Sequence, residues 1–219
     1  MADLSALREI DDLPSLLDRL RGTDVAELLD EAEPADLARL AEHISTPADL
    51  AALVALADDQ NEMVELFIDK ADSGTLRRIA ENISTPGELK ELLALAGNDT
   101  TVKAFVAKAG PKAMLNQVFT LMPTRFVPEK IGDSGVVEWH ITDGDDQHVY
   151  ILHIADGTAV AGSGGAEKPR TTLTMAVPVL LQLCAGTVDG VSAFMNQKVK
   201  LSGDMLFGAK LAGAFDTSA

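Results

Sequence analysis

Cysteine is almost absent from this chain of 219 residues, which contains a single one, Cys184. No disulfide can therefore form within the chain, and no cage of thiolate ligands can hold a metal ion. The segment around this residue, Leu181 to Cys184, is apolar and predicts a core thiol, because free cysteine packs as a small hydrophobe.

Basic residues are also scarce, with 18 lysines and arginines against 34 acidic residues and a net charge of −16. Residues 1–109 carry 23 acidic and 10 basic side chains, a net of −13, and residues 110–219 carry 11 and 8, a net of −3. An acidic field repels phosphates and anionic headgroups, and no basic cluster offsets it. We therefore expect no nucleic-acid partner.

Long apolar runs are missing too. The longest strongly apolar stretch, Ala176 to Ala185, is interrupted by Gln182 and is too short to span a bilayer. The first twenty residues lack the basic start and apolar run of a secretory signal. The sequence therefore predicts a soluble, cytoplasmic protein with no stable membrane insertion.

The common catalytic motifs are absent. The glycine-rich segment 162–165 is followed by no lysine-threonine pair and opens no helix, so it is not a phosphate loop. No serine lies in a nucleophile elbow, and the four histidines have no metal-ligand spacing. His140 and His148 flank a predicted hairpin, where we expect them to face each other or solvent. We predict no catalytic residue, no metal and no cofactor.

An internal repeat occupies the N-terminal half. Ile44 to Pro47 matches Ile83 to Pro86 at a spacing of 39, within the recurring segments LARLAEHISTPADLAALVALA and LRRIAENISTPGELKELLALA. Each Thr-Pro pair predicts a helix start with threonine as N-cap. Asp49 or Glu88, three residues after the cap, completes a capping box.

The apolar stripe of an amphipathic helix recurs through three copies of about three helices each. The predicted helices contain residues 13–20, 25–32, 37–44, 50–57, 64–71, 76–83, 89–96, 102–109 and 115–122. No single copy can bury its stripe alone, so we expect stacked helical repeats, as a short solenoid or a compact bundle. Such a domain, residues 1–109, would dock a protein partner or serve as a stability or solubility cap.

An alternating pattern begins after Pro123. Val137, Trp139 and Ile141 fall on one face of a predicted strand, and Glu138 and His140 fall on the other. Turn sequences then predict three antiparallel strands, followed by a fourth over 171–175, a helix over 177–185, a second short helix, a strand over 198–201 and a last helix over 204–215. The fold class is α+β, with a second domain over residues 110–219. The helix over 115–122 fits both domains.

Several segments of this second domain resemble the closing signature of sterol carrier protein lipid-binding domains. They are Lys168-Pro169, Leu173–Met175, Ala185–Asp189, Ala193–Met195 and Lys198–Met205. The resemblance implies a five-stranded sheet backed by helices around a hydrophobic tunnel, which would hold a sterol, fatty acid, acyl-CoA or similar lipid. The sequence departs from the family at Gln197, where glycine is usual, and at Arg170, where an acidic residue is common.

The apolar residues of this domain supply the candidate ligand contacts. Flexible methionines suit a cavity that adapts to different apolar guests, although the same residues could fill an ordinary core. The predicted ligand-binding residues are Phe119, Val137, Trp139, Ile141, Leu152, Met175, Leu180, Leu181, Cys184, Phe194, Met195, Met205, Leu206, Ala209 and Phe215.

These observations favour non-enzymatic binding and transfer of an apolar small molecule, with the helical repeats docking a protein partner. A first alternative is an enzyme or helper that acts on a hydrophobic intermediate in the tunnel, with Trp139, Tyr150 or a histidine as the polar contact. A second alternative is a scaffold that acts through its repeats and has a vestigial tunnel.

Overall fold

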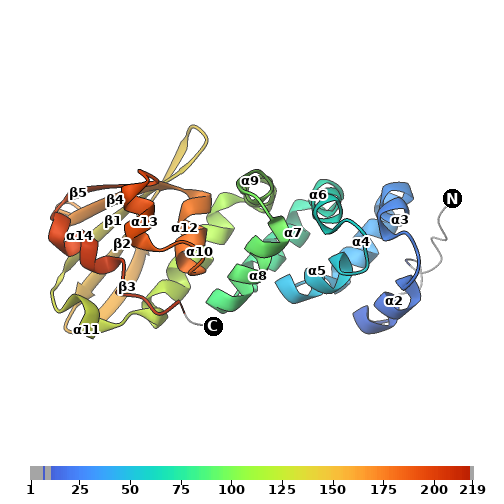
Figure 1. Cartoon of the computed structure of the whole chain (residues 1–219), viewed down its shortest axis with the longest axis horizontal. Helices are drawn as coiled ribbons and strands as arrows, with labels where there is room; N and C mark the ends of the chain where they lie inside the picture. The colour runs from blue at the N-terminus through green and yellow to red at the C-terminus, as the bar shows by residue number, and fades with distance from the viewer. Residues whose placement is uncertain (1–6, 8–10, 218–219) are drawn as a thin grey trace. The chain divides into compact units, whose positions relative to one another are not determined.

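The computed structural model describes Leu7 and residues 11–217 (Figure 1). Residues 1–6 and 8–10 of the predicted N-terminal domain, and residues 218–219, lie outside the described residues. The chain divides into two compact units, one made of Met1–Ile83 and Glu91–Met114 and the other of Ser84–Lys90 and Leu115–Ala219. The sheet lies in the second unit, and the fold is α+β, as predicted.

Helices alone form the chain from Leu13 to Leu121, and the predicted helices are confirmed. Within the described residues they are α2 (Leu13–Leu20), α3 (Val25–Glu31), α4 (Pro34–His43), α5 (Pro47–Val54), α6 (Gln60–Lys70), α7 (Ser73–Glu81), α8 (Pro86–Ala96), α9 (Asp99–Ala109) and α10 (Pro111–Leu121). Their buried faces carry the predicted apolar stripes, for example Leu50, Leu53 and Val54 in α5.

The repeat is visible in how the helices begin. At the start of α5, Thr46 Oγ1 accepts from the Asp49 backbone N–H at 3.1 Å, and Asp49 Oδ2 accepts from the Thr46 N–H at 2.9 Å. At the start of α8, Thr85 and Glu88 repeat both bonds at 3.2 and 3.1 Å. Both predicted capping boxes are therefore present, and each satisfies helix N–H groups that have no partner inside the helix.

Lysines link successive helices in the same way. Lys70 Nζ, at the end of α6, lies 2.9 Å from the Asp30 carboxylate near the end of α3. Lys108 Nζ, at the end of α9, donates to the Ile68 carbonyl near the end of α6 at 2.7 Å. A cation beside the last carbonyls of a helix is favourable because the helix dipole is negative there. Lys70 Nζ also donates to the Asp30 carbonyl at 3.4 Å, and Lys108 Nζ donates to the Asp69 carbonyl, so the series α3, α6, α9 repeats a lysine–carbonyl contact.

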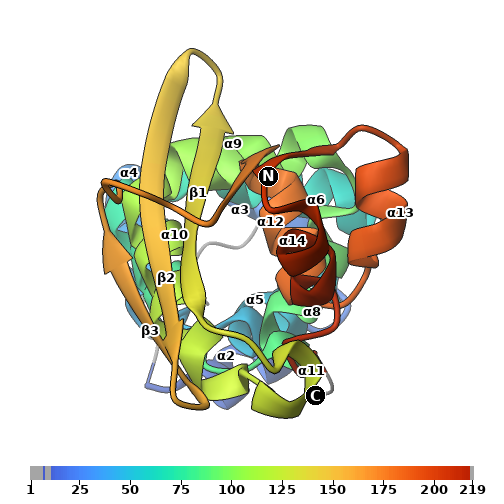
Figure 2. The same cartoon turned by 90° about the vertical axis from the view of Figure 1, so that its left-hand side faces the viewer.

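The second unit is built on one sheet of five strands in the order β3-β2-β1-β4-β5. These are β1 (Gly135–Asp143), β2 (Asp146–Ala155), β3 (Thr158–Ser163), β4 (Thr171–Ala176) and β5 (Val199–Gly203). Antiparallel pairing joins β1 to β2, β2 to β3 and β4 to β5, whereas β4 runs parallel to β1. Figure 2 shows β3, β2 and β1 side by side.

The register sorts the side chains onto two faces. Trp139 pairs with Tyr150 on β2 and with Leu173 on β4, so these three side chains share one face, which we call the inner face. The inner-face residues of the three central strands are buried, namely Val137, Trp139, Ile141, Tyr150, Leu152, Ile154, Leu173 and Met175. The other face, which we call the outer face, carries Glu138 and His140.

Short helices complete the second unit. They are the 3-10 helix η1 (Met122–Arg125), α11 (Pro128–Ile131), α12 (Val177–Cys184), α13 (Gly190–Met195) and α14 (Met205–Leu211). α12 contacts β1 and β4, and α14 contacts β4 and β5. A Cβ added to Gly208 of α14 would meet the Leu201 side chain at 2.3 Å, so α14 packs closely on β5.

The last helix is shorter than predicted. It ends at Leu211 instead of Phe215. The Ala214 carbonyl accepts from the Val127 N–H at 2.8 Å, and Phe215 forms a β-bridge with Phe126. After α14 the chain leaves the helix, and its backbone pairs with Phe126 and Val127, just before α11.

Candidate functional site

An aromatic cluster joins α10 to the inner face of the sheet. The Phe119 ring stacks on Tyr150 with the centroids 4.2 Å apart and an interplanar angle of 5°, and it meets the edge of Trp139 at 5.8 Å. The Tyr150 hydroxyl donates to Asn116 Oδ1 at 2.8 Å. Burial raises the pKa of Tyr150, so its hydroxyl stays protonated and its hydrogen-bonding capacity is used by α10.

Two other polar atoms of the inner face lack such a partner. Trp139 Nε1 and His148 Nε2 are both buried, and neither has a hydrogen-bond partner among the described residues. Trp139 as a whole is 5% exposed. Because His148 pairs with Ile141, it lies on the same face as Trp139, two residues before Tyr150 on β2.

More than half of the predicted ligand-binding residues are buried in the second unit. They are Phe119 from α10, Val137, Trp139, Ile141, Leu152 and Met175 from the inner face, and Leu180 and Leu181 from α12. Cys184 at the end of α12 is of intermediate exposure as a residue. Its sulfur is nevertheless enclosed, since burial raises the pKa of the thiol to about 12. The thiol is therefore uncharged and unreactive at neutral pH.

The predicted residues of the last two helices lie elsewhere. Phe194, Met195, Met205 and Leu206 are exposed by 43, 76, 50 and 72%, Ala209 is also exposed, and Phe215 is of intermediate exposure. The sequence suggests a last helix that is apolar nearly all round, but α14 buries one stripe of Phe207, Gly208 and Leu211. Asp204 is the N-cap of α14, and its Oδ1 accepts from the Phe207 N–H at 3.0 Å. This contact fixes where the helix begins and therefore which of its side chains face the interior.

The predicted ligand-binding residues do not include Tyr150, His148 or Phe207, although the enzyme alternative names Tyr150 or a histidine as a polar contact. Tyr150 and Phe207 are buried, and His148 is of intermediate exposure with a buried Nε2. Strict alternation along β2 places Tyr150 and His148 on the face of Leu152, and this signal was available in the sequence. The position of Phe207 depends on the N-cap of α14. His140 and His148, expected to face each other or solvent, lie on opposite faces, because His148 pairs with Ile141 and not with His140.

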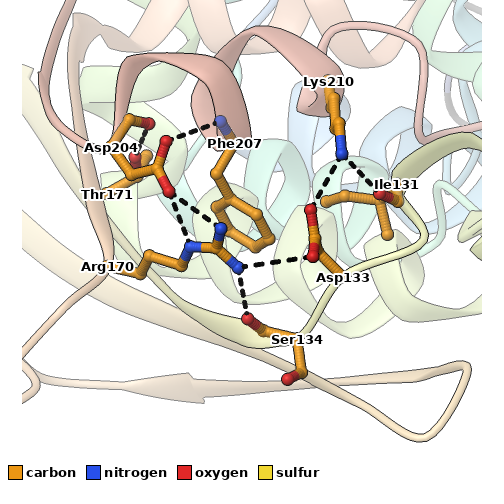
Figure 3. A network of polar contacts seen from close by, with 8 residues as sticks. All are labelled: Ile131, Asp133, Ser134, Arg170, Thr171, Asp204, Phe207 and Lys210. Atoms are coloured by element: carbon orange, nitrogen blue, oxygen red, sulfur yellow. Dashed lines mark hydrogen bonds and ion pairs between the residues drawn. The ribbon is translucent and has the colours of Figure 1, made fainter.

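A polar network, which we call the α14 clasp, holds α14 at the edge of the site (Figure 3). Arg170 Nε and Nη2 lie 2.9 and 2.8 Å from Asp204 Oδ2, and Nη1 donates to the Ser134 carbonyl at 2.8 Å. The guanidinium also covers the Phe207 ring, 4.2 Å from its centroid. Lys210 Nζ donates to Asp133 Oδ2 at 2.8 Å. Arg170, which departs from the family pattern, thus links Asp204 at the start of α14 to the Ser134 backbone before β1.

The clasp carboxylates are held in their charged form. The pKa of Asp204 is lowered first by the Phe207 backbone N–H and then by the Arg170 hydrogen bond. The pKa of Asp133 is lowered by the hydrogen bond and charge of Lys210. Both carboxylates are partly exposed to solvent, so the clasp is a positioning device for α14 and only a modest source of stability.

The outer face carries a satisfied polar group of its own. Glu138 Oε1 lies 2.6 Å from His140 Nε2, and Glu138 Oε2 accepts from the Ala166 backbone N–H at 2.6 Å. These contacts lower the pKa of Glu138, the backbone N–H more than the histidine. The segment around Ala166, between β3 and β4, is therefore tied to the outer face.

The described part of the chain has neither a metal-binding cluster nor a membrane-spanning helix. Within it, no group of three or more histidine, cysteine, aspartate or glutamate side chains is placed to hold a metal ion. No helix in the same part is both long and apolar enough to cross a membrane.

The fold and the apolar inner face define a small α+β domain of the lipid-carrier class. Residues 132–216 match the model of the SCP-2 sterol transfer family. This segment contains the whole sheet together with α12, α13 and α14, and it forms a domain of that family. The predicted resemblance is confirmed, and the match supports lipid binding or transfer in general.

Solved structures similar to this chain include sterol carrier proteins and one enzyme. Sterol carrier protein 2 like 2 from Aedes aegypti is 20% identical over 50% of this chain and 99% of its own, with a TM-score of 0.41. Sterol carrier protein 2 from Yarrowia lipolytica is 16% identical over 48% and 88%, with a TM-score of 0.38. A stereoselective inverting sec-alkylsulfatase from Pseudomonas sp. is 21% identical with a TM-score of 0.42. The match covers 89% of this chain but only 32% of the enzyme.

One of the two departures from the family pattern, Gln197, has an unusual backbone conformation. Gln197, where the family usually has glycine, adopts φ 58°, in the left-handed region. Glycine is favoured there because a side chain crowds the following carbonyl. The position therefore keeps its glycine-like backbone although its residue has changed.

Proposed function

We propose that residues 110–219 bind an apolar small molecule between the inner face of the sheet and the helices α10, α12 and α14, and transfer or present it without catalysis. The match of residues 132–216 to the SCP-2 sterol transfer family carries this proposal. The inner face supports it, because its side chains on the central strands are mostly apolar and offer a long surface to a hydrocarbon chain or ring system.

We place the boundary of this domain between Ala109 and Gly110, where α9 ends. The assignment of α10 to the lipid-binding domain is supported by the contacts of Asn116 and Phe119 with Tyr150. The ligand class comprises fatty acids, acyl-CoA, sterols and similar lipids. A cytoplasmic location is part of the same proposal and fits a chain whose single cysteine has no partner for a disulfide.

The acidic helical repeats, residues 1–109, are proposed to dock a protein partner. Their net charge of −13 supports a partner with a basic surface, since opposite charges steer association. The recurrence of the capping boxes and of the lysine contacts supports a repeat architecture, which is common among proteins that bind partners.

An enzyme or helper acting on a hydrophobic intermediate is the second candidate. The observation that favours it is the pair of unpartnered polar atoms on the inner face, Trp139 Nε1 and His148 Nε2. Such atoms could orient a reactive intermediate while the apolar walls exclude water. Turnover of a hydrophobic substrate, lost on changing one of these residues, would support this candidate over a carrier.

The proposed function is tested by native mass spectrometry of the purified full chain, followed by denaturing extraction. The expected result is an added mass that leaves on unfolding and that extracts as an apolar small molecule. If the protein is empty and also fails to take up added palmitic acid, cholesterol and palmitoyl-CoA, the proposal is wrong, and a scaffold acting through the repeats replaces it.

A further inference from the structure

Trp139 and His148, which we call the anchor pair, are exceptional among the polar side chains of the inner face. Buried indole N–H groups normally find an acceptor, and a buried donor without one loses hydrogen-bond energy that water would have supplied. Trp139 Nε1 and His148 Nε2 are buried without a partner in the described structure, while the neighbouring Tyr150 hydroxyl is satisfied by Asn116. The inner face therefore concentrates unmet hydrogen-bonding capacity at one place.

The strand register brings the two groups together. Trp139 pairs with Tyr150, and Ile141 pairs with His148, so Trp139 and His148 occupy diagonal positions on neighbouring strands and point to the same side. The backbones of diagonal neighbours on one face are roughly 7 Å apart, within reach of aromatic and long side chains, so the indole and the imidazole can both extend toward one oxygen atom. Phe119 and Ile141 surround this place with apolar contacts.

The two atoms differ in what they require. The indole Nε1–H can only donate, so it needs an acceptor, whereas His148 Nε2 donates or accepts according to the tautomer of the ring. A hydroxyl oxygen satisfies both atoms, because it accepts from the indole and can also donate to the imidazole or accept from it. An alkyl group satisfies neither atom, and its burial there would leave both without a partner.

We infer that the anchor pair binds a hydroxyl group of the apolar ligand, so that the domain prefers hydroxyl-bearing lipids over hydrocarbons of the same length. This inference rests on the proposed function, because it assigns a polar contact within the same site. It predicts that the hydroxyl end lies against β1 and β2 while the apolar remainder extends along the inner face.

The test compares dodecan-1-ol with dodecane by calorimetry on the full chain, with both ligands delivered from a cyclodextrin carrier. The quantity measured is the ratio of the dodecane to the dodecan-1-ol dissociation constant. A lost hydrogen bond should lower this ratio roughly fivefold in Trp139→Phe and in His148→Phe, which keep a ring at each position. His140→Phe is the matched control, because His140 lies on the outer face with its Nε2 2.6 Å from Glu138 Oε1, and its ratio should stay at the wild-type value.

The fluorescence of the wild type provides a second readout that needs no variant. Trp139 is the only tryptophan, so its emission reports on the anchor pair alone. Dodecan-1-ol should shift the emission to longer wavelength relative to dodecane, because a hydrogen bond to the indole stabilises its excited state.

The two hypotheses fail in different ways. If both ligands bind the wild type, but the ratio is unchanged in the two anchor variants and the emission does not shift, the anchor is wrong and the proposed function stands. If neither ligand binds the wild type although palmitic acid does, the anchor alone is wrong. If palmitic acid, cholesterol and palmitoyl-CoA also fail to bind, the proposed function is wrong, and the anchor falls with it. A variant with an altered circular dichroism spectrum is set aside, and the wild-type emission then decides.

Discussion

The two faces of the sheet treat polar groups in opposite ways. On the outer face, Glu138 contacts both His140 and the Ala166 backbone, so its oxygens are used within the protein. On the inner face, Trp139 is buried and His148 is of intermediate exposure, and the buried atoms Trp139 Nε1 and His148 Nε2 have no partner in the described structure. Residues one position apart on β1 therefore serve different purposes.

This difference supports the proposal that the inner face binds the ligand. A protein that only needed to fold would gain from satisfying the Trp139 N–H or from replacing the indole with a phenyl ring. The outer face shows that the strand can satisfy its polar groups when the fold needs it. The unpartnered Trp139 Nε1 and His148 Nε2 on the inner face support a site in which a bound molecule supplies their hydrogen-bond partner.

The largest expected effect comes from truncating an inner residue and comparing it with its outer neighbour. Trp139→Ala should lower the free energy of unfolding by about 3–5 kcal/mol, because it removes a buried aromatic side chain. His140→Ala, at a partly exposed position, should cost about 1 kcal/mol or less. Urea unfolding followed by circular dichroism measures both, and equal losses would contradict the assignment of the two faces.

A second prediction uses low pH to disrupt the Glu138 contacts on the outer face and leave the inner face unchanged. The pKa of Glu138 is lowered below its ordinary value of 4.5, so its contribution to stability is complete above that value and is lost as the pH falls through the lowered pKa. We expect a loss of about 1–2 kcal/mol for these charge-assisted hydrogen bonds.

Hydrogen exchange of the Ala166 amide measures this loss locally, and it should accelerate as the pH falls below 4.5 relative to inner-face amides. Glu138→Gln is the control, since it cannot titrate and should already show the faster exchange at neutral pH. An Ala166 amide that stays protected in both experiments would show that Glu138 does not hold this segment.

The smallest predicted effect lies outside both faces. Gln197→Gly should raise the free energy of unfolding by about 0.5–1 kcal/mol, because glycine relieves the strain of φ 58° but adds freedom to the unfolded chain. Ligand affinity should not change, since Gln197 is exposed and lies between α13 and β5. Destabilisation measured by thermal unfolding would show that the Gln197 side chain has a role that its backbone does not reveal.

The sequence predicted the elements well because their signals are local. Thr46 with Asp49 and Thr85 with Glu88 specify helix starts through contacts within four residues, and alternation along β1 and β2 separates the faces of each strand. Alternation and turn signals also predicted the order of the later elements, which the structure confirms, and the sterol carrier signature identified the family that the match of residues 132–216 confirms.

The errors occurred where distant contacts decide. α14 was predicted to reach Phe215, but Ala214 and Phe215 bond to Val127 and Phe126, nearly 90 residues earlier in the chain. Met205 and Leu206 are exposed because the Asp204 N-cap and the packing of Gly208 on Leu201 fix which side of α14 faces the sheet. An apolar composition alone does not specify which stripe of a short helix is buried.

The central claim, that the inner face binds the ligand, is tested most directly by filling that face and measuring the displacement of a fluorescent fatty acid. Met175→Trp enlarges a buried side chain on β4 and should weaken binding at least about tenfold, while Ala209→Trp adds the same indole to an exposed position of α14 and should leave binding unchanged. Unaltered affinity in a folded Met175→Trp protein, or an equal loss in both variants, would contradict the account.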